Sequence, residues 1–150
     1  ILRPDFRLTL VESVGKKADF CSEVVKQLNL DNTRVLHARA EDLGQDIAHR
    51  EKYDWAVARA VAPMPVLAEY LLPFVRIGGG VLAQKGSGAR SELDQAAGAI
   101  ALLGGELLQV DEFELPYIKE KRALVKIGKR KPSPSKYPRK AGLPSKKPLT

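Results

Sequence analysis

Three stretches of the sequence end in polar side chains that could bind a nucleoside. Glu12 follows the apolar run 8–11, and a carboxylate there can accept hydrogen bonds from both hydroxyls of a ribose. Ala40 and Glu41 follow the run 35–38, where a small residue lets a flat base approach and a carboxylate or backbone group can accept from an adenine amino group. Arg59 follows the run 55–58 and can bind a carboxylate through two parallel hydrogen bonds. These positions are the first candidates for a ligand site.

Each of these positions also has a structural interpretation that the residues leave open. Glu12 could be a solvated strand end, and Glu41 could simply favour the first turn of a helix. Arg59 is flanked by small apolar residues and could form a salt bridge with Glu12 or Asp54. The stretch 85–88, Lys-Gly-Ser-Gly, could touch a phosphate, but a flexible loop is the better interpretation.

The elements that would position these residues alternate between strands and helices. Phe20, Val24 and Leu28 recur at a spacing of four, which predicts a helix with one apolar face. A glycine turn is predicted at 78–80, directly before a strand. Strands are predicted at residues 8–11, 35–38, 55–58, 81–83, 106–115 and 123–127, and helices at 16–28, 63–72 and 91–103.

This order predicts an α/β fold with a mostly parallel sheet and helices on both faces. The last two strands are joined by a short charged link, which predicts an antiparallel hairpin at the C-terminal end of the sheet. Ligands of such sheets bind at the carboxyl ends of the strands, where Glu12, Glu41 and Arg59 fall. Trp55 and Tyr70 are predicted to lie in the core.

All of the positive net charge lies in the last 22 residues. The chain carries a net charge of +7, whereas residues 1–128 carry −1 and residues 129–150 hold eight Lys or Arg and no acidic residue. The sequence therefore divides into a domain, 1–128, and a basic, proline-rich C-terminal tail, 129–150. Such a tail favours a polyanion as partner, and its prolines are expected to stiffen it and prevent helix formation. A disordered, solubilising tail is the alternative.

Composition narrows the class of protein further. No apolar run approaches the roughly 20 residues that span a bilayer, and no signal peptide is recognisable, so a cytoplasmic protein without a membrane partner is expected. His37, His49 and Cys21 are the few soft metal ligands, and no zinc site is predicted from them. A single cysteine excludes an internal disulfide and fits a reducing compartment.

Taken together, several segments resemble the bacterial small-subunit ribosomal RNA methyltransferase G family, also called glucose-inhibited division protein B. The residues Leu-Val-Glu-Ser-Val-Gly-Lys-Lys at 10–17 look like one strand segment of that family, and Arg-Ala-Val-Ala-Pro at 59–63 is among the most specific parts. The resemblance runs over essentially the whole chain, and its other segments are 39–42, 78–86, 136–144 and 146–149.

The resemblance implies a Rossmann-like, S-adenosylmethionine-dependent methyltransferase that acts on N7 of a guanine in 16S rRNA. The partner is expected to be 16S rRNA or the small ribosomal subunit, and a monomer is expected. It implies that Ala40 and Glu41 contact the adenosine part of the cofactor and that Arg59 belongs to the cofactor site. Glu12 occupies the ribose-binding position usual for the wider fold. The tail would contact RNA phosphates, and the residues expected to do so are Lys136, Arg139, Lys140, Lys146 and Lys147.

The resemblance also implies that part of the family's domain is not in this sequence. The family's first strand and glycine-rich cofactor loop are expected just before Ile1, and no such Gly-x-Gly pattern occurs here. We therefore expect a C-terminal portion of the domain, which lacks the first strand and leaves apolar faces unpaired. The isolated 150-residue chain is expected to fold poorly and to methylate little.

The implied chemistry needs little from the side chains. Guanine N7 has a free lone pair, so no proton has to be removed before it attacks the methyl group. The main contribution of the enzyme is then to orient the two reactants. No catalytic acid or base is predicted, and Arg59 with residues 61–65 is expected to shape the pocket mouth. The alternative function is a non-catalytic RNA-binding module on a degenerate Rossmann-like scaffold. A nicotinamide-dependent oxidoreductase ranks last, because no catalytic Tyr-Lys pair is evident.

Overall fold

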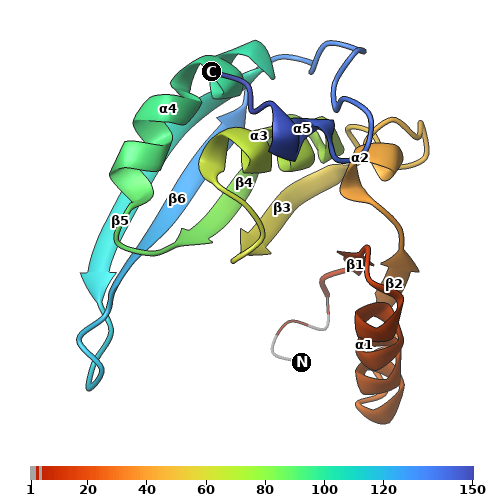
Figure 1. Ribbon diagram of the computed structural model, residues 1–150. Helices are drawn as coiled ribbons and strands as arrows, with labels where there is room; N and C mark the ends of the chain where they lie inside the picture. Colours follow the sequence, from red (N-terminus) through yellow and green to blue (C-terminus); the bar gives the residue numbers. More distant parts are fainter. Residues whose placement is uncertain (1–2, 4) are drawn as a thin grey trace.

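Strands and helices alternate along the computed structural model, which describes Arg3 and residues 5–150 (Figure 1). The predicted helices are confirmed to within two residues at each end. The strands are β1 (Leu8–Glu12), β2 (Thr33–His37), β3 (Tyr53–Arg59), β4 (Val75–Lys85), β5 (Gly105–Glu114) and β6 (Lys121–Lys129). The helices are α1 (Gly15–Gln27), α2 (Ala40–Leu43), α3 (Met64–Leu71), α4 (Ala89–Leu102) and α5 (Leu143–Lys146), with a 3-10 turn η1 (Leu72–Phe74).

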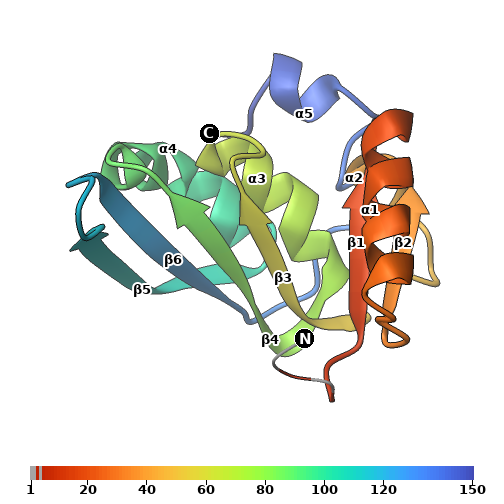
Figure 2. The same cartoon turned by 90° about the horizontal axis from the view of Figure 1, so that it is seen from below.

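The described strands form two sheets rather than one. β1 and β2 pair in parallel, and a second sheet has the order β3-β4-β6-β5. Within the second sheet β3 and β4 are parallel, β6 runs antiparallel to β4, and β5 and β6 form the predicted antiparallel hairpin. Figure 2 shows the carboxyl ends of β1, β3 and β4 at the same edge. The α/β class, the parallel pairing and the hairpin are therefore confirmed.

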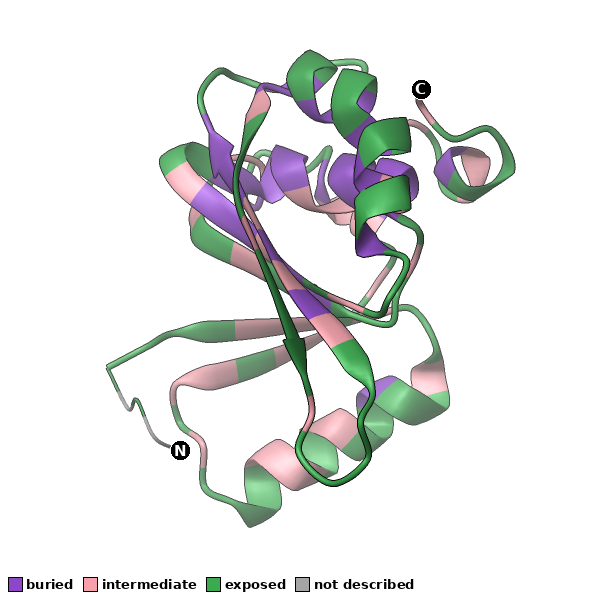
Figure 3. Cartoon of the chain, turned by 90° about the vertical axis from the view of Figure 1, so that its left-hand side faces the viewer, coloured by how far each residue is buried: buried purple, intermediate pink, exposed green. Residues whose placement is uncertain are grey.

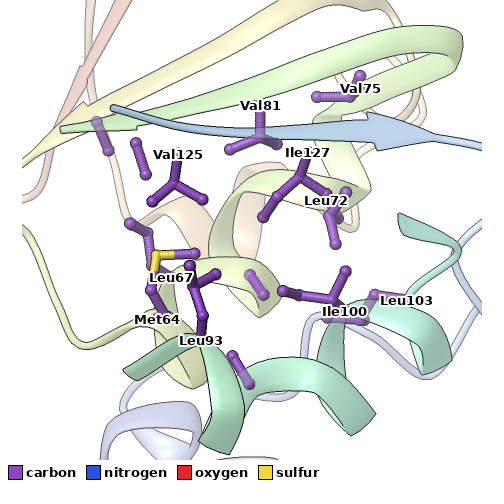
Figure 4. Packing of buried hydrophobic residues seen from close by; sticks show 14 of the residues in the cluster. Met64, Leu67, Leu72, Val75, Val81, Leu93, Ile100, Leu103, Val125 and Ile127 are labelled. Atoms are coloured by element: carbon purple, nitrogen blue, oxygen red, sulfur yellow. The ribbon is translucent and has the colours of Figure 1, made fainter. Parts of the chain in front are cut away.

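The core lies between one face of the larger sheet and the helices α3 and α4 (Figure 4). Alternate residues of the central strands, such as Val81 and Val125, point to that face and are fully buried. They pack against Leu67 and Leu72 from the α3–η1 segment and Ile100 from α4. Burial of each large aliphatic side chain contributes about 1.5–3 kcal/mol, so this region is the most stable part of the fold.

The other face of the larger sheet carries no helix within the described residues, which corrects the expectation that Trp55 is core. Trp55 and Val57 are 49% and 59% exposed, because strand alternation turns them away from α3 and α4. The ammonium of Lys126 lies 5.5 Å from the centroid of the Trp55 ring on that face. Figure 3 shows the alternation of buried and exposed residues along the sheet.

The apolar face predicted for the first helix is also exposed. Phe20 and Leu28 are 69% and 51% exposed, and Ala18 is the buried residue of α1. α1 packs on β1 and β2, whose own apolar residues are only partly covered. Spacing correctly predicted the helix, but Phe20 and Leu28 of that face are exposed and only Val24 is partly buried.

The glycines at 78–80 lie inside β4 instead of forming a turn before it. The ladder between β3 and β4 is irregular at Tyr53 and Trp55, and Gly78 has a φ of +84°, which favours glycine. A Cβ on Gly79 would lie 2.4 Å from the carbonyl oxygen of Asp54. The glycines therefore form a bulge that lets the two backbones approach closely. None of the described helices is long and apolar enough to cross a membrane.

Candidate functional site

The predicted cofactor residues lie at the carboxyl ends of the parallel strands. Glu12 ends β1, Ala40 begins α2 shortly after β2, and Arg59 ends β3. Because parallel strands end at one edge of a sheet, the sequence order places these residues on the ligand-binding side of the fold (Figure 2).

Glu12 is partly engaged with its own loop. Its Oε1 accepts a hydrogen bond from the backbone N–H of Val14 at 2.8 Å, and its backbone carbonyl accepts from Ala38 at 3.0 Å. Oε2 has no hydrogen bond in the part of the chain that the structure describes. One carboxylate oxygen is therefore available to a ribose hydroxyl, and the other orders the turn after β1.

Glu41 is directed toward the tail. It is only 3% exposed, and its Oε1 accepts the backbone N–H of Gly142 at 2.8 Å. The N–H groups in the first turn of a helix have no intrahelical acceptor, and no side chain caps them in α2. A nucleoside at Ala40 would therefore meet backbone donors and a methyl group, while the Glu41 carboxylate binds a distant segment of the chain.

Arg59 forms neither of the salt bridges that the sequence left open. Asp54 pairs with Arg76 at 2.6 Å, and the Glu12 carboxylate binds Val14. The Arg59 side chain is exposed and has no acceptor among the described residues. Ala60, the next residue, has a φ of +55°, an unusual conformation for a residue with a Cβ. Strain of this kind is frequent at ligand sites.

A cleft of about 390 Å³ opens beside Arg59, and we call it the strand-end cleft. The ends of β3 and β4, the start of α4 and the β5–β6 hairpin form its walls. The lining residues are Arg59, Ala60, Gln84, Lys85, Gly86, Glu92, Phe113, Leu115, Arg122, Ala123 and Leu124. Lys85 donates to Glu92 at 2.6 Å and to the carbonyl of Ala62 at 3.0 Å, and Glu92 also accepts the N–H of Met64. Lys85 therefore holds the start of α3 in place and is not left free for a phosphate.

The tail folds back on the body of the protein instead of being disordered. Tyr137 is 6% exposed and Pro138 is among the fully buried side chains. The Arg50 guanidinium donates to the carbonyls of Ser133, Pro134 and Tyr137 and to that of Gly44 at the end of α2. These contacts fix the tail to the segment after β2.

A buried ammonium anchors the first residues of the tail. Lys129 is fully buried, and its ammonium donates to the carbonyls of Leu72 and Leu103 and to the Ser133 hydroxyl, with Glu51 at 3.6 Å. Burial lowers the pKa of Lys129 to about 8, because desolvation disfavours its charged form more than Glu51 favours it. Every proton of the ammonium thus has an acceptor.

The tail also contains a helix, contrary to the expectation that its prolines prevent one. α5 is a single turn with Pro144 near its start, preceded by Gly142 with a φ of +80°. Proline is compatible with the first turn of a helix because the N–H it lacks would have no intrahelical acceptor there.

Arg139 is engaged differently from the other tail residues predicted to bind RNA. Its guanidinium donates to both carboxylate oxygens of Glu69, at 2.6 Å from Nη2 and 2.9 Å from Nε, and its backbone N–H donates to the same side chain at 2.8 Å. Glu69 is fully buried on α3. These hydrogen bonds raise the pKa of Arg139 above its ordinary value. By contrast, the exposed lysines are Lys136, Lys140, Lys146 and Lys147.

A second cavity, of about 370 Å³, is lined both by a predicted cofactor residue and by predicted RNA-binding residues, and we call it the tail cavity. Its lining combines α2 with the tail: Glu41, Asp42, Gln45, Lys136, Pro138, Arg139 and Lys140. Sequence reasoning did not find Glu69, Arg50 or Lys129. Among these three residues, only Glu69 could have been noticed from the sequence, because it is an acidic residue inside the otherwise apolar run of α3.

The fold is shared with solved methyltransferases. A 16S rRNA (adenine(1408)-N(1))-methyltransferase mutant from Catenulisporales acidiphilia superposes with a TM-score of 0.68 at 10% identity, covering 89% of this chain and 78% of that one. An rRNA methylase from Streptococcus thermophilus gives a TM-score of 0.61 at 16% identity, with 86% and 78% covered. These likenesses show that the chain shares the Rossmann-like fold of those proteins.

The sequence comparisons are more specific. The family model described as rRNA small subunit methyltransferase G matches residues 1–125, and the chain belongs to that family. Curated relatives include the ribosomal RNA small subunit methyltransferase G of Desulforamulus reducens, 48% identical over 99% of this chain and 62% of that protein. That of Deinococcus radiodurans is 47% identical over 99% of this chain and 59% of that protein. The chain thus spans about three fifths of the length of these relatives.

Proposed function

We propose that this chain provides the adenosine side of the cofactor site, the acceptor cleft and an RNA-binding surface of an S-adenosylmethionine-dependent methyltransferase acting on guanine N7 in 16S rRNA. The observation that carries the proposal is the order of Glu12, Ala40–Glu41 and Arg59 along one edge of the sheets, in a chain of this family. The relatives' printed names supply rRNA of the small subunit as the substrate class.

The described residues fit the adenosine half of the cofactor. Oε2 of Glu12 would accept from the ribose, and the first turn of α2 would receive the base beside Ala40. Arg59, which has no acceptor among the described residues, is suited to the cofactor's carboxylate. When bound, S-adenosylmethionine supplies a methyl group on a sulfonium centre.

The strand-end cleft is suited to a reaction without a general base. Glu92 is the acidic residue in its lining, and that carboxylate is already bound by Lys85 and by the N–H of Met64. A base that presents a ring lone pair needs only to be oriented. Phe113, which is 43% exposed on the cleft wall, offers a surface on which a purine can stack.

RNA would approach across the tail. Lys136 and Lys140 line the tail cavity, and Lys146 and Lys147 lie on and just after α5, all with exposed side chains. Lysines in such positions contact phosphates and orient the RNA without reading its sequence. We propose that the protein acts as a monomer in the cytoplasm, on free 16S rRNA or on the small ribosomal subunit.

The proposal is tested with the protein expressed from its complete open reading frame. Incubation with S-adenosylmethionine and unmodified 16S rRNA should produce one N7-methylguanine, mapped by chemical cleavage at that base. Arg59→Met should lower the yield at limiting cofactor, whereas Arg76→Met, an exposed arginine paired with Asp54, should not. RNA binding without cofactor binding or methylation would instead support the alternative of a non-catalytic RNA-binding module.

A further inference from the structure

The connection between β5 and β6 projects beyond the ends of the parallel strands. β6 runs antiparallel to β4, and Ala123 near the start of β6 pairs with Lys85 at the carboxyl end of β4. Residues 115–120, which we call the hairpin tip, therefore extend past the edge of the sheet at which Arg59 lies. The hairpin also forms one wall of the strand-end cleft, through Phe113, Leu115 and Arg122. The hairpin tip thus stands beside the place where an acceptor base would enter.

A tyrosine at the hairpin tip takes no part in the core. Tyr117 is 100% exposed. The N–H of Ile118 donates to the carbonyl of Pro116 at 2.9 Å, and Tyr117 between them has a φ of +71°. A γ-turn with a positive φ at its centre is rare and strained. The N–H of Leu115 donates to the carbonyl of Glu120 at 2.9 Å and closes the tip. The backbone therefore holds an aromatic side chain out in solvent, and strain of this kind is frequent at binding sites.

Unpaired cations lie next to this ring. Lys119 and Lys121 are exposed, and neither ammonium has an acceptor in the described part of the chain. Arg122 differs from them, because its guanidinium is paired with Glu120. Proteins bind single-stranded nucleic acids with this combination, in which an aromatic ring stacks on a base and neighbouring cations contact the phosphates. The chemistry of the hairpin tip therefore favours RNA as its partner.

The position of the ring also suits the proposed reaction. Enzymes that modify a base draw it out of its stack into a pocket. The base next to the target then loses a stacking partner. Phe113 lies in the lining of the strand-end cleft, whereas Tyr117, four positions further along the chain, lies outside that lining. A target base in the cleft would thus leave its neighbour near the exposed tyrosine ring.

We propose that Tyr117 stacks on the base adjoining the target guanine and that Lys119 and Lys121 bind phosphates of the same single-stranded RNA segment. Figure 2 shows the hairpin tip at one end of the row of strands and α2, beside the tail, at the other. The RNA therefore extends from the tail across the strand ends to the hairpin tip. The inference rests on the proposed function, because it takes RNA as the substrate.

The test of the stacking contact uses the protein expressed from its complete open reading frame. The Kd for a radiolabelled, unmodified 16S rRNA transcript is measured by filter binding. Tyr117→Ala should raise this Kd about tenfold, within the range found when one base loses its aromatic partner. Tyr117→Phe keeps the ring and should bind as tightly as the unmodified protein.

The two lysines are tested by the salt dependence of the same Kd. Lys119→Ala/Lys121→Ala should lower the slope of log Kd against log salt concentration by about 1.4, because each phosphate contact on a single strand contributes about 0.7. Lys26→Ala/Lys52→Ala removes the same charge from exposed positions at the end of α1 and before β3, near the opposite edge of the sheets. That control should keep the slope of the unmodified protein, and Tyr117→Ala should keep it too.

Several outcomes would contradict the inference. An unchanged Kd for the transcript in Tyr117→Ala would overturn it, and so would an equal loss of affinity in Tyr117→Phe. If Tyr117→Ala lowered methylation of the assembled small ribosomal subunit but not binding of the transcript, the hairpin tip would contact a ribosomal protein instead, which also overturns the inference. Failure of the unmodified protein to bind the transcript would overturn the proposed function itself.

Discussion

The tail and the β1–α1–β2 unit both adjoin α2, but they are held to the molecule in opposite ways. The tail is the most basic and proline-rich part of the chain, yet Ser133, Tyr137 and Pro138 within it are buried. The β1–α1–β2 unit has regular amphipathic elements, yet Phe20 is 69% exposed. Buried, fully hydrogen-bonded charges therefore hold the tail in place, whereas the β1–α1–β2 unit leaves much of its apolar surface exposed.

The comparison has a consequence for the function of each region. Buried ion pairs specify one geometry, because any other arrangement leaves a charge without compensation. The tail therefore acts as a fixed wall of the candidate site and not as a flexible arm. Variants at Arg139, Lys129 and Val57 test this contrast.

The largest effect is expected from the ion pair between α3 and the tail. Arg139→Met leaves the fully buried Glu69 carboxylate without its guanidinium, so the free energy of unfolding should fall by about 3–5 kcal/mol. Arg76→Met breaks an exposed pair with Asp54 and should cost less than about 1 kcal/mol. Urea denaturation of both variants measures the difference, and equal losses would show that the tail pair is not special.

A smaller effect is expected at Lys129. Lys129→Met removes the buried ammonium that donates to the carbonyls of Leu72 and Leu103, and the free energy of unfolding should fall by about 1–3 kcal/mol at neutral pH. Each carbonyl keeps one other donor, the N–H of Val75 for Leu72 and the hydroxyl of Ser133 for Leu103. Urea denaturation at pH 7 checks the value, and an unchanged midpoint would contradict the role given to the ammonium.

The pH dependence of the same pair of proteins tests the buried charge. The pKa of Lys129 is about 8 in the folded protein and 10.5 when unperturbed, so between these values the unfolded state binds more protons. The advantage of the unmodified protein over Lys129→Met should therefore grow as the pH rises from about 8 toward 10.5 and stay constant below 8. Urea midpoints at several pH values measure it, and an advantage that shrinks over this interval would contradict the burial of the charge.

The smallest effect is expected on the open face of the larger sheet. Val57→Ala should cost less than about 1 kcal/mol, because Val57 is 59% exposed. Leu67→Ala, on the covered side, removes a side chain that is 2% exposed and should cost about 2–5 kcal/mol. Thermal unfolding of both variants gives the comparison, and a large loss for Val57→Ala would show that this face is covered in solution.

The sequence predicted the elements well because they depend on local periodicity. Helix α4 and the β5–β6 hairpin were predicted within a few residues, since spacing, glycines and link length determine them. Trp55 was misplaced because periodicity identifies two faces of a strand but not which of them another element covers. The glycines at 78–80 were taken as a turn because a bulge and a turn share the same composition.

The tail contacts lay beyond prediction for a different reason. Glu69 and Arg139 are 70 positions apart in the sequence, and Glu41 and Gly142 are 101 apart. No local pattern pairs a given carboxylate with a donor at such a distance. The strand-end residues Glu12 and Arg59 were found because the fold class places them, whereas the anchoring residues depend on the particular path of the tail.

The hydrogen bond from Gly142 to Glu41 holds the tail against α2, and amide hydrogen exchange of the protein expressed from its complete open reading frame tests it. The amides of Gly142 and Arg139, both bound to buried carboxylates, should exchange as slowly as amides in the middle of β4 and β6. Exchange at both positions as fast as in an unstructured peptide would contradict a tail fixed against α2 and α3.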